Sequence, residues 1–215
     1  ARIMLEPQKN WSVNNPKKLS IVIKTLSKIK DQFDSKKRSV SIADLIVLAG
    51  GVGIEMAAKK AGQKVNVPFT AGRGDARQDQ TDIHSFGLLE PQADGFRNYL
   101  NGGASNVSAE EKLVDKAQLM GLTSPEMTAL IGGMRVLNTN YDGSNYGVFT
   151  NKPGSLTNDY FVNLLDMDTT WKEEDKSEQT FVGKDRKTQK IKWKATSCLL
   201  YTSPSPRDRT RSRMP

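Results

Sequence analysis

The sequence predicts a mainly α-helical domain with a small β-hairpin near its C-terminus. The first observation is helical periodicity, because apolar residues recur at helical spacing in three long stretches, within 16–33, 40–61 and 123–135. The second is that cap residues precede the first and third of these stretches. The third is a pair of short β-prone segments, 181–182 and 191–193, on either side of a polar turn.

Length and composition narrow the class of protein. The chain has 215 residues, enough for one good-sized core. No apolar run approaches the roughly 18 residues of a membrane span, so no membrane partner is expected. The N-terminus lacks the features of a signal peptide and a starting Met, so we expect a chain cut from a longer one. Cys198 is the one cysteine, which excludes an internal disulfide and suits a reducing compartment; we expect a cytoplasmic location.

The formal net charge of +8 raises the alternative of a basic nucleic-acid-binding module. Lys and Arg are spread along the chain and interleaved with acidic residues. No motif combines basic and aromatic residues for stacking on bases. We therefore expect no nucleic-acid partner.

The first predicted helix begins at Asn15-Pro16, a cap followed by a residue suited to the first turn. Its apolar face is formed by Leu19, Val22, Ile23, Leu26, Ile29 and Phe33. In the second helical stretch, Gly50, Gly51 and Gly53 are expected to interrupt the apolar pattern, which resumes from Ile54. The run G-G-V-G lacks the Lys-Ser/Thr of a phosphate-binding loop. Close packing of helix against helix explains these glycines better.

Residues 70–82 form a predicted polar loop with alternating acids and bases. Asp75, Asp79 and Asp82 could supply oxygen ligands to a metal, but their spacing is not that of an EF-hand and nearby arginines compete for them. His84 is the only histidine, and it lies on the same polar region. We expect it to be a surface or interface residue.

Ser108 to Glu111 form a predicted capping box, which opens a helix that runs through Met120 and is closed by Gly121. Residues 138–153 are rich in turn formers and are predicted to be irregular. A short helix capped by residues 157–159 follows. Its inward side chains are predicted to be Phe161, Leu164 and Leu165.

The stretch T-S-P-E-M-T-A-L-I-G-G-M-R at 123–135 predicts the central buried helix. Its apolar stripe consists of Met127, Leu130, Ile131 and Met134. We expect Leu130 and Ile131 to be buried in one core with Leu45 and Ile46. Gly132 and Gly133 predict either the close approach of another element or a helix stop.

Residues 197–215 break with the rest of the chain. They show no periodicity and combine three Pro with four Arg. One interpretation is a disordered basic tail; the other, which we favour, is a non-native sequence such as a translated cloning segment. We therefore expect a partial domain over 1–196 and an unordered tail after it.

Several stretches together resemble bacterial-type catalase-peroxidases. They are S-I-A-D-L-I-V-L-A-G-G (41–51), V-P-F-T-A-G-R-G-D-A (67–76), 80–100, M-T-A-L-I-G-G-M-R-V-L (127–137) and 147–167, in the order in which that family has them. The resemblance covers residues 1 to about 196 and falls in the C-terminal half of that protein.

The resemblance implies half of a tandem duplication of a class I haem-peroxidase domain. The N-terminal half of such a protein holds haem b and removes hydrogen peroxide by catalase and peroxidase reactions, as part of the oxidative-stress response. The C-terminal half keeps the helical frame, binds no haem, and supports the haem domain and the dimer. The implied partners of this chain are thus the N-terminal haem domain of its own parent and a homodimer partner.

The resemblance also implies that this chain carries no catalytic, cofactor-binding or metal-binding residues. Where the proximal helix of haem peroxidases presents its histidine, this chain has Arg135, or Met134 if the register slips by one. An arginine stays protonated and is not a usable iron ligand.

We expect Arg135 to pair with a nearby carboxylate or to contact the missing half. The rival, a self-sufficient haem peroxidase, needs an axial imidazole, and only His84 could supply one.

Overall fold

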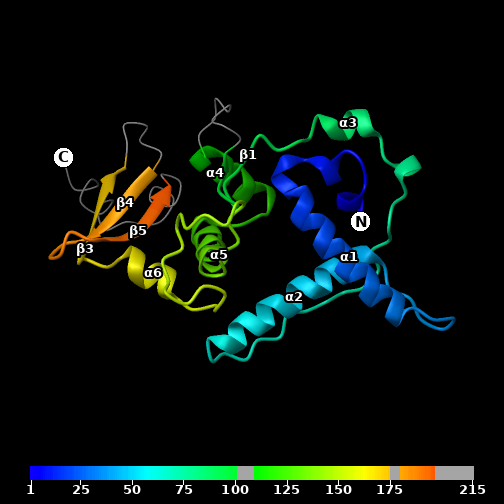
Figure 1. Ribbon diagram of the computed structural model, residues 1–215, viewed down its shortest axis with the longest axis horizontal. Coiled ribbons are helices and arrows are strands. Elements are labelled where there is room, and N and C mark those ends of the chain that lie inside the picture. The colour runs from blue at the N-terminus through cyan, green and yellow to red at the C-terminus, as the bar shows by residue number, and fades with distance from the viewer. Residues whose placement is uncertain (101–108, 175–179, 197–215) are drawn as a thin grey trace. The chain divides into compact units, whose positions relative to one another are not determined.

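A computed structural model describes residues 1–100, 109–174 and 180–196 of the chain (Figure 1). The chain divides into two compact units, Ala1–Pro91 and Gln92–Pro215, and each is described by itself. The predicted tail at 197–215 and the first residue of the predicted capping box, Ser108, lie outside the described residues.

The first unit is helical. Its 3₁₀ turns are η1 (Arg2–Met4), η2 (Gln8–Asn10), η3 (Ser12–Asn14) and η4 (Gln78–Gln80), and its helices are α1 (Pro16–Phe33), α2 (Ile42–Lys60) and α3 (Ile83–Gly87). The second unit combines helices with strands. It contains β1 (Ala93–Asp94), β2 (Tyr99–Leu100), α4 (Ala109–Leu119), α5 (Ser124–Val136), α6 (Asp159–Leu164), β3 (Thr169–Glu173), β4 (Thr180–Asp185) and β5 (Ile191–Thr196).

The mainly helical class with a small C-terminal sheet is confirmed. The predicted hairpin corresponds to β4 and β5, which pair antiparallel with Phe181 opposite Ala195. The structure adds a strand that the pattern did not predict, β3, which pairs antiparallel with β4 and gives the order β3-β4-β5. The segment is only five residues long and its last two are charged. Its strand conformation therefore depends on pairing with β4 more than on its own pattern.

Helix α1 begins as predicted, since the Asn15 side chain accepts a hydrogen bond from the amide of Lys18. The glycines that interrupt the apolar pattern do not interrupt the next helix, because α2 is continuous through Gly50, Gly51 and Gly53. Glycine weakens a helix without removing its backbone hydrogen bonds, so a well-capped helix of this length continues through it. The cap of α2 is Ser41, whose hydroxyl accepts from the amide of Asp44 at 2.9 Å.

Helix α5 lies at the centre of the second unit and contributes to two apolar cores. Met127 and Ile131 pack with Leu113 and Ala117 of α4. Val136, at the other end of α5, belongs to the second cluster, whose further members are Phe149, Tyr160, Phe181 and Ala195. The start of the helix is fixed by the capping box of Thr123 and Glu126.

Two burial predictions need correction. Ile131 is buried, but Leu130 is only partly buried at the edge of its cluster. On α6 the fully buried side chain is Tyr160, while Leu165 is exposed. The Tyr160 ring stacks on Phe149 at a centroid distance of 5.2 Å. This stacking explains why Tyr160, rather than Leu165, points into the core. Leu45 is buried within the first unit, whereas Ile131 belongs to the second.

Candidate functional site

The candidate site is the position on α5 where the resemblance places a metal-binding imidazole in haem peroxidases. Arg135 occupies it, one turn after Ile131, and its side chain is 0% exposed. A buried guanidinium is costly unless its donors are satisfied, so its partners decide what this position can do. Met134, the neighbour in a slipped register, is half-buried.

The Arg135 guanidinium donates hydrogen bonds to the loop between β1 and β2. Its Nη1 donates to the carbonyl of Phe96, and its Nη2 donates to the carbonyl of Gly95 at 2.8 Å and to Oδ1 of Asn98 at 3.1 Å. The planar fork of donors suits several acceptors that converge on one point. The guanidinium is therefore engaged by partners within its own unit. The partners found here are two backbone carbonyls and an amide oxygen, and contact of Arg135 with the missing half stays a prediction.

The loop that receives Arg135 is shaped by Asp94. The Asp94 carboxylate accepts from the amide of Phe96 at 2.9 Å and forms an ion pair with Arg97. Asn98 then adopts a left-handed backbone conformation with φ of +53°, a conformation that Asn tolerates better than most residues. These local interactions turn the loop so that two successive carbonyls and one side-chain oxygen face α5.

Asn98 extends the contact of Arg135 to a third segment. Its Nδ2 donates to Oδ1 of Asn140 at 3.2 Å and to the carbonyl of Tyr146 at 3.1 Å. Asn140 is buried, and its own Nδ2 donates to the carbonyls of Ser144 and Tyr146 at 2.6 and 3.0 Å. Arg135, Asn98 and Asn140 with these carbonyls form what we call the Arg135 network.

The Arg135 network joins the helical and sheet parts of the second unit. The amide of Gly147, directly after Tyr146, donates to the carbonyl of Lys194 on β5 at 2.7 Å. The amide of Tyr141 donates to the carbonyl of Arg97 at 2.7 Å. Hydrogen bonds that join buried groups from several segments hold those segments in one arrangement. The role of Arg135 at this position is therefore structural, since its hydrogen bonds hold α5 to the loop between β1 and β2.

The residues at this position do not fit haem ligation. Iron in a peroxidase frame needs an axial imidazole, whereas a guanidinium keeps its proton and has no lone pair to offer.

Gly132, the first of the two adjacent glycines of α5, is closely approached by side chains of α6. A Cβ added there would lie 2.6 Å from Cζ of Phe161 and 2.8 Å from Cδ1 of Tyr160. Of the two alternatives for the glycine pair, close approach of another element is the one that holds at Gly132.

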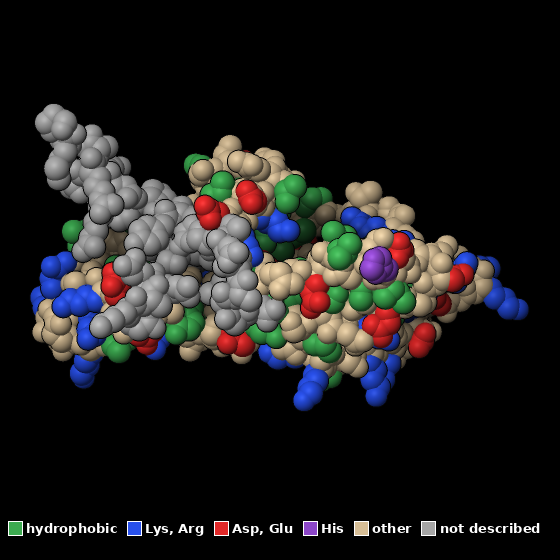
Figure 2. Space-filling model, turned by 90° about the horizontal axis from the view of Figure 1, so that it is seen from above, with side chains coloured by type: hydrophobic (Ala, Val, Ile, Leu, Met, Phe, Trp, Pro, Cys, Tyr) green, Lys and Arg blue, Asp and Glu red, His purple; other side chains and the backbone are tan. Residues whose placement is uncertain are grey.

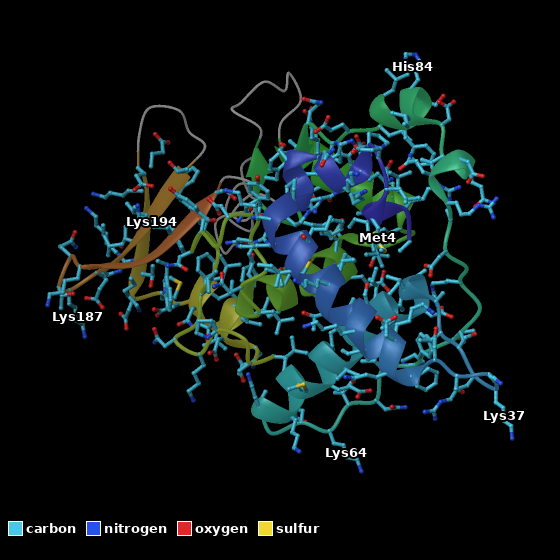
Figure 3. The ribbon with its side chains drawn as sticks, turned by 45° about the vertical axis from the view of Figure 1, so that its right-hand side comes forward. Met4, Lys37, Lys64, His84, Lys187 and Lys194 are labelled. Carbon is cyan, nitrogen blue, oxygen red and sulfur yellow. The ribbon has the colours of Figure 1, made fainter. Side chains whose placement is uncertain are left out.

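His84 does not come near α5 in sequence and lies in the other unit. It is on α3, a helix of five residues, and its side chain is exposed. Figure 2 shows the single histidine at the molecular surface, and in Figure 3 the His84 side chain points outward from α3. The expected surface placement of His84 is confirmed.

The three aspartates of the alternative metal site have separate partners. Asp75 accepts from the amides of Ile42 and Ala43 at 2.8 and 3.0 Å, and so caps α2 although it lies more than 30 residues further along the sequence. Asp79 pairs with Arg77, and Asp82 caps α3. Over residues 1–100, 109–174 and 180–196, no three acidic, His or Cys side chains are grouped to hold a metal ion.

The contact of Asp75 with α2 is matched by a contact in the opposite direction. Asp44, in the first turn of α2, accepts from the amides of Gly72 and Arg73 at 2.9 and 3.2 Å and from the Arg73 side chain. The hydrogen bond from Gly72, with those from Arg73, lowers the pKa of Asp44 although burial opposes this. Burial raises the pKa of Asp75. The hydrogen bonds from the α-amino group of Ala1 and from the amides of Ile42 and Ala43 outweigh this effect and lower the pKa below its usual value. The polar loop is therefore held against α2 by two ionised carboxylates.

The glycines of α2 do not form a phosphate-binding loop. They lie inside a continuous helix, where the amides of successive turns are used by backbone hydrogen bonds. No helix in the described part of the chain has the length and apolarity needed to cross a bilayer.

Sequence reasoning did not identify Asn98 and Asn140, which complete the Arg135 network. Asn98 lies 37 residues from Arg135 in the sequence and 42 residues from Asn140. The turn-rich composition of 138–153 was the one available signal, and it predicted irregular backbone without naming the partner.

Comparison with known proteins gives a consistent result. A sequence model of the family described as Peroxidase matches residues 1–198. The chain is 59% identical over 209 residues to a catalase-peroxidase of Clostridium botulinum (strain Alaska E43 / Type E3), covering 95% of the chain and 28% of that relative. It is 60% identical over 203 residues to a catalase-peroxidase of Marinomonas sp. (strain MWYL1), covering 93% and 27%. The chain thus spans little more than a quarter of the length of the curated relatives it matches.

Proposed function

The chain belongs to the peroxidase family, and from this premise we propose that it is the non-catalytic C-terminal part of a catalase-peroxidase. The parent removes hydrogen peroxide at a haem b held by its N-terminal half. The present chain contributes a folded support for that half and for the dimer. Its own residues bind no haem and carry out no chemistry.

The observation that carries this proposal is the burial and bonding of Arg135. A peroxidase needs an imidazole on the iron and a distal base to move the peroxide proton. The helix that matches the proximal helix carries a guanidinium that donates to Gly95, Phe96 and Asn98 instead. One exposed histidine, His84, cannot fill both roles. The position that presents an imidazole in haem peroxidases holds in this chain a guanidinium with a structural role.

The parent supplies the haem in this proposal, since no described residue of this chain suits it as an axial ligand. The partners are the N-terminal haem domain of the same polypeptide and the second protomer of a homodimer. The predicted cytoplasmic location and the absence of a nucleic-acid partner remain predictions.

The test compares peroxide turnover by two proteins at equal molar concentration. One is the full-length parent and the other is the 215-residue chain, each incubated with haem and then freed of excess haem. Oxygen release from hydrogen peroxide is expected from the full-length parent alone. Turnover by the 215-residue chain well above that of free haem would contradict the proposal.

A further inference from the structure

Helix α2 has apolar side chains exposed on opposite sides along its middle part. The exposed fractions are 40% for Val47, 38% for Leu48, 44% for Val52, 40% for Ile54 and 58% for Met56. Val47 and Ile54 are seven residues apart and share one side of the helix, whereas Val52 and Met56 are four apart and share another, roughly opposite side. No charged residue lies between Val47 and Ile54. A helix that is apolar all round is normally buried.

Within its own unit, α2 is contacted by α1 and has buried residues near both ends, such as Leu45 and Ala58, whereas its middle is covered by one segment. The amide of Val67 donates to Oε1 of Glu55 at 2.8 Å, and Val67 also packs against Gly51. This covering segment, residues 65–69, leaves the other sides of the middle of α2 exposed, and its own Val65 and Phe69 are exposed as well. In Figure 1 this segment runs back beside α2 toward the start of the helix.

The glycines of α2 give an independent observation. Nothing lies within 4 Å of the position that a Cβ would take at Gly50 or at Gly53. Gly132 on α5 has a clear reason in this chain, because Phe161 and Tyr160 occupy the space of its missing side chain. Gly50 and Gly53 weaken α2 without such a reason among the described residues. Glycine at such positions permits the close approach of another backbone.

We infer that the middle of α2, Val47 to Met56, is an interface covered by apolar helices from the part of the same polypeptide that lies outside this chain. The inference rests on the proposed function, in which the chain is one part of a longer protein. The length available is large, because the chain spans 28% of its relatives. The stretch from Val47 to Ile54 carries no charge and so matches an apolar partner, and the glycines let that partner approach closely.

A second copy of the chain fits this surface less well. A two-fold symmetric contact joins the same face of both copies, so it covers one side of a helix. The exposed side chains of α2 lie on opposite sides, with Ile54 on one and Val52 on the other. Covering both requires more than one neighbouring element, which a longer polypeptide supplies.

The test measures accessibility with N-ethylmaleimide in the 215-residue chain and in the full-length protein. Val52→Cys and Ile54→Cys probe opposite sides of α2, and Lys60→Cys at its exposed polar end is the matched control. All three are made in a Cys198→Ser background, and labelling of the α2 peptide is followed by mass spectrometry. In the 215-residue chain all three thiols should react at similar rates. In the full-length protein the Val52→Cys and Ile54→Cys thiols should react at least about 100-fold more slowly, as groups that react only after local opening, while the Lys60→Cys thiol keeps its rate.

Equal labelling of the Val52→Cys and Ile54→Cys thiols in both proteins would overturn the inference. Protection that appears in the 215-residue chain as its concentration rises would also overturn it, because a second copy would then be the occupant. Hydrogen exchange of amides 47–54 in the unsubstituted proteins gives the same comparison if a variant fails to fold. Neither measurement depends on haem, so failure of the proposed function is read separately from peroxide turnover.

Discussion

Gly132→Ala is expected to destabilise the second unit even though alanine is the better helix former. The added Cβ would lie 2.6 Å from Cζ of Phe161 and 2.8 Å from Cδ1 of Tyr160, distances at which one of the groups must move. Tyr160 is 1% exposed and stacks on Phe149, and Phe161 meets Tyr160 edge to face at 5.2 Å. The rings therefore support each other and cannot turn away freely.

The magnitude follows from two opposing effects. Overpacking a well-packed contact costs about 1–3 kcal/mol, and replacing glycine inside a helix returns up to about 1 kcal/mol. With the full return from the helix propensity, a net loss of up to about 2 kcal/mol is expected for Gly132→Ala. Gly133→Ala is the matched control, because its Cβ would lie 3.6 Å from Leu156, an ordinary contact. That variant should be neutral or more stable by up to about 1 kcal/mol.

The assay is urea unfolding followed by tryptophan fluorescence. Trp171 and Trp193 pack against the cluster that contains Tyr160, so their emission reports on this part of the chain. The difference between the two glycine variants isolates the contact of α5 with α6. Equal stability of Gly132→Ala and Gly133→Ala would refute the reasoning, because it would mean that Phe161 and Tyr160 do not occupy the space beside Gly132.

Three further predictions concern the same unit. Arg135→Met should lose at least about 1–3 kcal/mol of unfolding free energy, because it leaves buried neutral acceptors without their donor, and Arg135→Lys should recover only part of it; urea unfolding measures both. Ile131→Ala should lose about 2–5 kcal/mol and Leu130→Ala clearly less in the same assay, since Leu130 is only partly buried; an equal loss would contradict their different burial. The hydrogen bond from Lys192 lowers the pKa of Asp166 to about 2, below an unfolded value of about 4. The stabilisation of the folded state by ionised Asp166 is therefore fully present above pH 4 and is lost as the pH falls through 2. In a pH series of unfolding curves, the difference in stability between the unsubstituted chain and Asp166→Asn should close over that range.

Local signals in the sequence predicted the helices well. Thr123 and Glu126 form the capping box of α5, and Asn15 caps α1, because these interactions join residues three positions apart. Gly121, with φ of +65°, follows the end of α4 where a helix stop was predicted.

The features that the sequence did not predict depend on distant partners. Strand β3 is stabilised by β4, and Tyr160 takes the buried position on α6 through its stacking on Phe149. The partners of Arg135 lie 37 to 40 residues away in the chain, so no spacing rule could name them. The resemblance identified the position of Arg135 as unusual, and the structure supplied its role.

The measurement that tests the central claim most directly is a haem titration of the purified 215-residue chain, followed by Soret absorbance. The account predicts a gradual, non-stoichiometric rise like that of haem with an unrelated protein, because the position on α5 holds a buried and hydrogen-bonded guanidinium. Arg135→His alone should not restore turnover of peroxide, because the one histidine of the sequence, His84, is exposed on the five-residue helix α3 and lacks the enclosed setting of a distal base. A sharp one-to-one Soret endpoint with the unsubstituted chain would contradict the account.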